Sequence, residues 1–76
     1  MKHFEIGYGI GNHTFTWACS TAYEALDALA DIFSHDPRAK KLEMDEYMEI
    51  LLDIKSGKRT SYNECPVLIH YLDGEV

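Results

Sequence analysis

The sequence predicts an α+β domain with two layers, in which a small, mostly antiparallel sheet is backed by two helices in the order strand, strand, helix, helix, strand. Three observations predict this class. Apolar residues alternate with small or polar ones up to residue 19, recur at helical spacing between residues 22 and 54, and end in a β-branched and aromatic run. The chain of 76 residues is expected to be one domain, residues 1–76, without a deep active-site cavity.

The first two strands are predicted as a hairpin whose two-residue turn is Gly11 and Asn12, a pair suited to the positive φ angles of tight turns. The numbers of facing residues then sum to 23. One face of this hairpin is large and apolar, and the other is small and polar. The first face holds Phe4, Ile6, Tyr8, Phe15, Trp17 and Cys19, and the second holds Glu5, Gly7, Gly9, Thr14, Thr16 and Ala18. We expect Trp17 to be buried under the helices, so that its truncation leaves the protein largely unfolded.

The first helix is predicted to begin after Thr21, because Thr21 and Glu24 have the spacing of a capping box. Its apolar residues recur at helical spacing and form one stripe. The stripe comprises Ala22, Ala25, Leu26, Leu29, Ile32 and Phe33. The helix should end at residue 34 or 35, since Pro37 disfavours a helical backbone at the residue before it.

A second helix is predicted near residues 43–56, with Gly57 as its C-terminal cap. Its inward face is expected to hold Met44, Tyr47, Met48, Leu51 and Ile54. The preceding segment DPRAKK has the cap-and-proline start of a helix. The sequence therefore leaves open whether this segment forms a short helical turn of its own.

The last predicted strand is PVLIHYL, residues 66–72. Both of its faces are rather apolar, with Val67, Ile69 and Tyr71 on one and Leu68, His70 and Leu72 on the other. Such a strand either lies at the centre of the sheet with both faces partly covered, or presents one face to another molecule. Within the irregular stretch before it, RTSYN is a candidate for a short fourth strand.

The net charge of −6 is concentrated in the helical middle of the chain, where residues 21–54 hold nine acidic residues and three basic ones. This balance disfavours direct binding to nucleic acid, which requires clustered lysine and arginine. The sequence has neither an apolar run as long as a membrane span nor the apolar core of a signal peptide, so we expect a cytoplasmic protein that does not bind membranes.

Several patterns that could support catalysis or metal binding are incomplete. The glycines of GYGIGN lack the third glycine of a dinucleotide fingerprint, and SGKRTS lacks the upstream glycine of a P-loop. Cys19, Cys65, His3 and His70 are of zinc-binding type but lack the close pairs of structural zinc sites. A Cys65 nucleophile with a histidine base is a distant alternative. We expect free cysteines, no metal, no cofactor and no enzymatic activity.

Two kinds of surface are candidates for binding a partner. Acidic residues form a stripe on each helix, Glu24, Asp27 and Asp31 on the first and Glu46, Glu49 and Asp53 on the second. We favour the interpretation that these stripes only solvate the helices, with docking of a basic protein surface as the alternative. The second candidate is the glycine and threonine side of the hairpin, where missing side chains allow close approach. It comprises Gly7, Gly9, Thr14 and Thr16.

The segments NHTFTWACSTAYEALDAL and PVLIHYLDG, together with the acidic helix between them, resemble the small uncharacterised accessory proteins of clostridial conjugative transposons. The resemblance implies a cytoplasmic bacterial protein that acts in maintenance of the element or in host interaction, and it identifies no functional residue. We therefore predict a non-enzymatic protein that binds another protein, with a homodimer as the first candidate. An acidic modulator of a protein that handles nucleic acid is the second.

Overall fold

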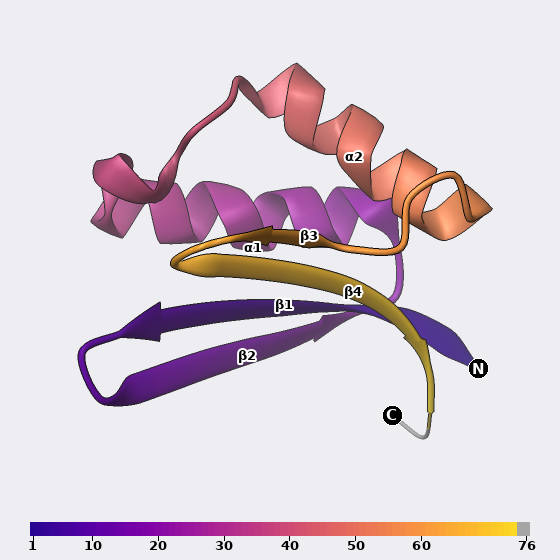
Figure 1. Cartoon of the computed structure of the whole chain (residues 1–76), viewed down its shortest axis with the longest axis horizontal. Coiled ribbons are helices and arrows are strands. Elements are labelled where there is room, and N and C mark those ends of the chain that lie inside the picture. Colours follow the sequence, from indigo (N-terminus) through magenta and orange to yellow (C-terminus); the bar gives the residue numbers. More distant parts are fainter. Residues whose placement is uncertain (75–76) are drawn as a thin grey trace.

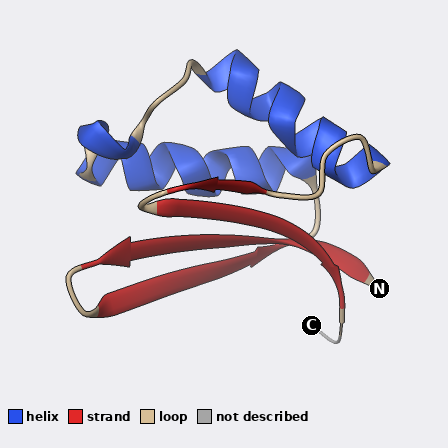
Figure 2. Cartoon of the chain, viewed as in Figure 1, coloured by secondary structure: helices blue, strands red, loops and turns tan. Residues whose placement is uncertain are grey.

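Four antiparallel strands form a single sheet in the order β2-β1-β4-β3, and both helices lie on the same side of it (Figures 1 and 2). This computed structural model describes residues 1–74. The elements are β1 (Lys2–Ile10), β2 (His13–Cys19), α1 (Ala22–His35), the short 3₁₀ helix η1 (Pro37–Ala39), α2 (Met44–Ser56), β3 (Tyr62–Glu64) and β4 (Val67–Asp73). The predicted two-layer α+β class is confirmed.

The hairpin of β1 and β2 has the predicted register, because Phe4 faces Cys19, Ile6 faces Trp17 and Tyr8 faces Phe15. Its turn differs in one detail. Gly11 has a φ of 59°, but no residue other than glycine has a positive φ among the described residues. The turn therefore needs a left-handed backbone only at its first central residue, which is the glycine requirement of a type II′ turn.

The helix-covered face of the sheet forms the core, but the edge strand β2 is less buried than predicted. Phe4 and Ile6 of β1 and Ile69 of β4 are completely buried. Phe15 is 49% exposed and Trp17 is only partly buried. The expectation of a fully buried Trp17 was wrong because β2 lies at the edge of the sheet, where the helix layer ends.

Helix α1 begins and ends as predicted. The Thr21 hydroxyl accepts a hydrogen bond from the Glu24 backbone N–H at 3.1 Å, while the Glu24 carboxylate accepts one from the N–H of Ser20 instead of Thr21. The backbone N–H groups of Ser20 and Glu24, at the start of α1, therefore both have hydrogen-bond acceptors. Most of the predicted stripe is buried, except that Leu26 is only partly covered and Ala28 joins the buried set.

The connection to α2 contains the separate helical turn that the sequence left open, η1. Helix α2 ends at Gly57, whose φ of 88° is the left-handed cap predicted for it. Met44 and Met48 are only partly buried, and Ile50 is buried in their place beside Leu51. A capping box between Glu43 and Glu46, which was not predicted, fixes the start of α2.

Strand β4 lies between β1 and β3, so the last predicted strand is an interior strand. The candidate fourth strand exists as β3, and its Tyr62 is buried with its ring 5.8 Å from that of Tyr47, edge to face. The turn between β3 and β4 contains a cis peptide bond before Pro66. The predicted central position of β4 is confirmed, but helices cover only one of its two faces.

Candidate protein-binding surfaces

The first candidate surface is the face of the sheet opposite the helices, here called the open sheet face. Residues alternate between the two faces along each strand, so the buried core residues identify the remaining set. This set comprises His3, Glu5, Gly7, Gly9, Thr14, Thr16, Ala18, Asn63, Leu68, His70 and Leu72. The four predicted residues of the glycine and threonine side therefore lie on one face, next to the apolar residues of β4.

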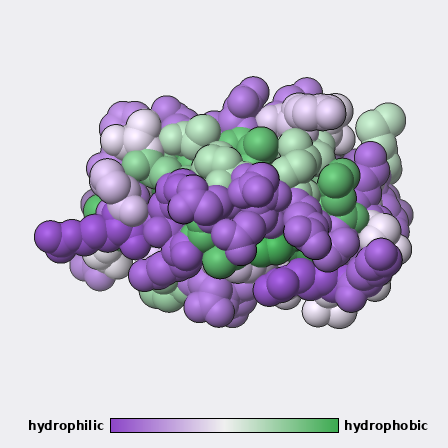
Figure 3. All heavy atoms as spheres, turned by 90° about the horizontal axis from the view of Figure 1, so that it is seen from above, coloured by the Kyte–Doolittle hydropathy of each residue, from purple (hydrophilic) through white to green (hydrophobic). Residues whose placement is uncertain are grey.

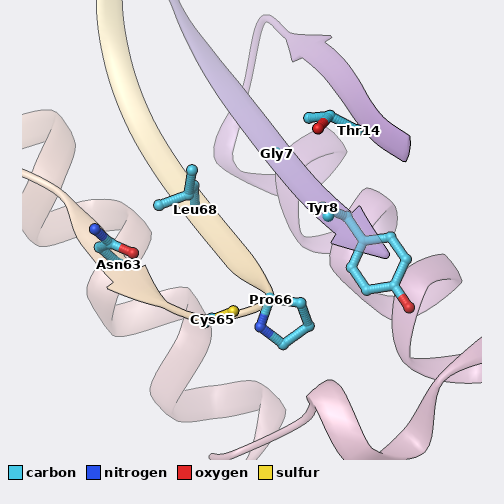
Figure 4. Close-up of a pocket in the computed structure, with 8 residues that line it drawn as sticks. Gly7, Tyr8, Thr14, Asn63, Cys65, Pro66 and Leu68 are labelled. Carbon is cyan, nitrogen blue, oxygen red and sulfur yellow. The ribbon is translucent and has the colours of Figure 1, made fainter. Parts of the chain in front are cut away.

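A shallow pocket of about 210 Å³ is formed at one end of the open sheet face (Figure 4). Its lining includes Gly7, Gly9 and Thr14 of the hairpin, together with Cys65 and Leu68. The pocket exists because the glycines contribute no side chain. A Cβ atom at position 9 would meet no atom within 4 Å, and one at position 7 would lie 3.5 Å from the Cβ atom of Leu68.

The open sheet face carries exposed leucines and almost no charge. Leu68 is 38% exposed although it is paired on both sides, and Leu72, which lies beyond the residues of β4 that pair with β3, is 41% exposed. Among the strand residues described on this face, Glu5 is the only lysine, arginine, aspartate or glutamate, and it faces His70. The excess of acidic residues lies on the helical layer instead. Figure 3, which views the molecule from the helical side, shows polar residues over much of that surface.

The four zinc-type residues are not brought together. Cys19 is buried on the helix-covered face, Cys65 is exposed in the turn before β4, and His3 and His70 belong to the open sheet face. Burial, and to a smaller extent the Glu24 carboxylate, raises the pKa of the Cys19 thiol, which disfavours the thiolate needed for nucleophilic attack or metal binding. Within residues 1–74 no cluster of three or more potential ligands is close enough to hold a metal ion.

The second candidate surface is a groove of about 240 Å³ between β2 and the last turns of α1, here called the aromatic groove. Its lining consists of Tyr8, Phe15, Trp17, Asp31, Ile32 and His35. The ring of Phe15 lies 6.5 Å from the rings of both Tyr8 and Trp17. The sequence alone did not predict this groove, although two large aromatic residues, Phe15 and Trp17, on one strand are a signal for it once that strand is known to lie at the sheet edge.

A hydrogen bond ties the floor of the aromatic groove to the segment after α1. The Tyr8 hydroxyl donates to the Asp36 carboxylate at 2.6 Å. This bond is the main cause that raises the pKa of Tyr8, because ionisation of the phenol would remove the donated proton. Tyr8 therefore acts as a neutral donor that holds β1 and the start of η1 together.

The two acidic stripes have different surroundings. Asp31 lines the aromatic groove, which places the stripe of α1 on the side of the helix next to β2. On α2, Glu46 and Glu49 are exposed and Asp53 is half-buried. The Glu46 carboxylate accepts a hydrogen bond from the Glu43 N–H at 3.1 Å, so one member of this stripe has a structural role as part of a helix cap.

Two further findings concern the whole of the described chain. None of the helices in residues 1–74 combines the length and the apolar character needed to cross a membrane. Comparison of the chain with protein-family models, with curated proteins and with solved structures finds no match.

Proposed function

We propose that the protein is a non-enzymatic binding protein that self-associates through its open sheet face. The observation that carries this proposal is the exposure of two leucines of β4, Leu68 and Leu72, on a face that no helix covers. Covering apolar surface of this kind is favourable by roughly 25 cal/mol per Å². The residues of β1 and β2 next to Leu68, such as Gly7 and Thr16, are small, which allows a second sheet to approach that end of the face to the spacing of about 10 Å that stacked sheets adopt.

Stacking through the open sheet face limits the charge repulsion between two copies of this chain. Two molecules with a net charge of −6 repel each other at long range, so they can associate only where the acidic surfaces stay apart. Face-to-face stacking of the open faces keeps both helical layers on the outside of the dimer. It also brings together the surfaces on which Glu5 is the one carboxylate among the described strand residues.

The cellular setting that we propose follows from the resemblance of the sequence to accessory proteins of conjugative transposons. It is the cytoplasm of a bacterium that carries such an element, with a role in maintenance of the element or in contact with the host. A second candidate function is modulation of a basic protein by the acidic residues of α2. The exposure of Glu46 and Glu49 favours it.

The experiment that tests self-association is sedimentation equilibrium on the wild type and on Gly9→Arg. Because a side chain at position 9 meets no protein atom near its base, this substitution adds bulk and charge to the open sheet face without disturbing the fold. We expect a concentration-dependent dimer for the wild type and a monomer for Gly9→Arg, with unchanged far-UV circular dichroism. Ala30→Arg, on the exposed side of α1, is the matched control and should dimerise like the wild type. A wild type that stays monomeric at all concentrations would overturn the proposal.

A further inference from the structure

Strand β2 is a long edge strand without the features that usually protect such an edge. Natural sheets block their edges with lysine and other charged residues, proline, bulges or very short strands. The opposite edge strand, β3, has three residues. Strand β2 has seven residues, HTFTWAC, with no lysine, arginine, aspartate, glutamate or proline, and it pairs with β1 without interruption from His13 to Cys19.

The hydrogen-bond pattern identifies which backbone groups of β2 point outward. In an antiparallel sheet, each residue directs its N–H and C=O groups to one neighbouring strand, and successive residues alternate. The N–H of Gly9 donates to the carbonyl oxygen of Pro66, on the β4 side of β1, at 3.0 Å. Gly9 and Thr14 therefore form a non-hydrogen-bonded pair of the hairpin. It follows that Thr14, Thr16 and Ala18 direct their backbone groups away from β1, toward the free edge.

The aromatic groove lies beside this edge, on the helix-facing side of the sheet. Phe15 is 49% exposed and Trp17 is partly covered, and both line the groove. A strand added alongside β2 would place every second side chain on the same side as these two rings. The exposed parts of the two rings provide apolar contact area for a side chain of the added strand. They can also bind a cationic side chain that lies over a ring.

The charge next to the edge strand is negative. Glu24, Asp27 and Asp31 are all exposed and follow one side of α1, and Asp31 reaches the aromatic groove. Helix α1 contains no lysine or arginine. The one basic group that pairs with this stripe among the described residues is the ring of His35, 3.8 Å from the Asp31 carboxylate. The stripe is therefore available to attract a cation.

We propose that the free edge of β2 binds an extended peptide segment of a partner protein by strand addition, and that the segment carries lysine or arginine at alternate positions. Backbone hydrogen bonds to Thr14, Thr16 and Ala18 supply affinity, while the acidic stripe of α1 and the aromatic groove select a basic side chain. A second copy of β2 fits this edge less well, because it brings no lysine or arginine and places two acidic stripes close together. This site is separate from the open sheet face and goes beyond self-association.

The test uses fluorescence anisotropy with labelled seven-residue peptides of alternating lysine and valine, matched in length to β2. We expect saturable binding that weakens as salt is raised, and binding at least about tenfold weaker for the same peptide with glutamate in place of lysine. Two further peptides carry N-methyl groups on either alternate set of amides. One of them should lose binding and the other should keep it, because only one set faces β2.

Variants of the protein test the same geometry from the other side. Thr16→Pro removes an outward N–H without removing a bond of the hairpin, and should abolish binding. Asp27→Asn with Asp31→Asn should weaken binding several-fold, whereas Glu64→Gln, at an exposed position of the opposite edge strand β3, should leave it unchanged. The proposal is overturned if lysine and glutamate peptides bind alike, if neither binds, or if both N-methylated peptides bind fully. It is also overturned if Thr16→Pro dissociates a dimer of the peptide-free protein, since β2 would then pair with itself. Gly9→Arg should leave peptide binding intact, which separates this proposal from self-association.

Discussion

The two faces of the sheet are built from the same strands but differ in how far their side chains are removed from water. On the helix-covered face, alternate residues of β1 and β4, such as Phe4 and Ile69, are completely removed from water. On the open sheet face, Leu68 beside Ile69 is exposed and Glu5 beside Phe4 is half-buried, although His3, on the other side of Phe4, is buried. Because side chains alternate, stability can be placed on one face and binding on the other without conflict. Substitutions should therefore have large effects on folding on one side and small effects on the other.

The largest difference is expected between Phe4→Ala and Leu72→Ala. Phe4 is fully buried with its ring 4.7 Å from that of Tyr71, so its truncation leaves a cavity and should reduce the free energy of unfolding by about 3 to 5 kcal/mol. Leu72 is 41% exposed on the open sheet face, and its truncation should cost less than about 1 kcal/mol. Urea unfolding monitored by circular dichroism measures both. Equal losses would mean that the open sheet face is also part of the core.

Trp17→Ala is expected to have an intermediate effect. The side chain packs against the core from the edge strand but is only partly covered, so we expect a loss of about 2 kcal/mol and a protein that still folds. This replaces the expectation, based on full burial, of an unfolded protein. The measurement is again urea unfolding, with Phe15→Ala as the control at the more exposed end of the same strand. A fully unfolded Trp17→Ala variant would show that the edge strand is as critical as β1.

High pH should destabilise the protein through the helix-covered face. Burial, and then the hydrogen bond with Tyr47, raises the pKa of Tyr62 above its ordinary value. Below pH 10 this phenol is neutral in both the folded and the unfolded state. Above pH 10 the unfolded state ionises first, so the free energy of unfolding falls by about 1.4 kcal/mol per pH unit until the folded-state pKa is passed. Tyr62→Phe should flatten this fall between pH 10 and 11, whereas Tyr23→Phe, at an exposed position of α1, should not.

Local signals were sufficient to predict the hairpin register and the helix ends. The turn at Gly11, the proline after α1 and the glycine after α2 each act on their immediate neighbours, so no knowledge of the tertiary structure is needed. The partial burial of Trp17 and the aromatic groove depend on which strand lies at the edge and how far α1 extends over it. Both depend on tertiary contacts, which the alternation of residues along one strand cannot predict. Met48 was expected to be buried on α2, but Ile50 is buried instead. This difference is also a long-range effect, because it depends on how α2 is rotated about its axis against the elements that it packs on.

The smallest effect on stability is expected for the acidic stripe of α2. Replacing Glu46, Glu49 and Asp53 with Gln, Gln and Asn should change the free energy of unfolding by no more than about 0.5 kcal/mol. Charges at the surface contribute little to stability. In addition, a glutamine at position 46 can still accept the hydrogen bond from the N–H of Glu43. Urea unfolding measures this effect, and pull-down at increasing salt measures binding. If the stripe only solvates the helix, the triple variant retains every partner of the wild type. If it docks a basic surface, binding weakens strongly, and wild-type binding falls steeply as salt screens the attraction. A partner could instead bind the variant with Asp27→Asn and Asp31→Asn but not the triple variant. That result would show that α2, and not the surface beside the β2 edge, recognises basic segments.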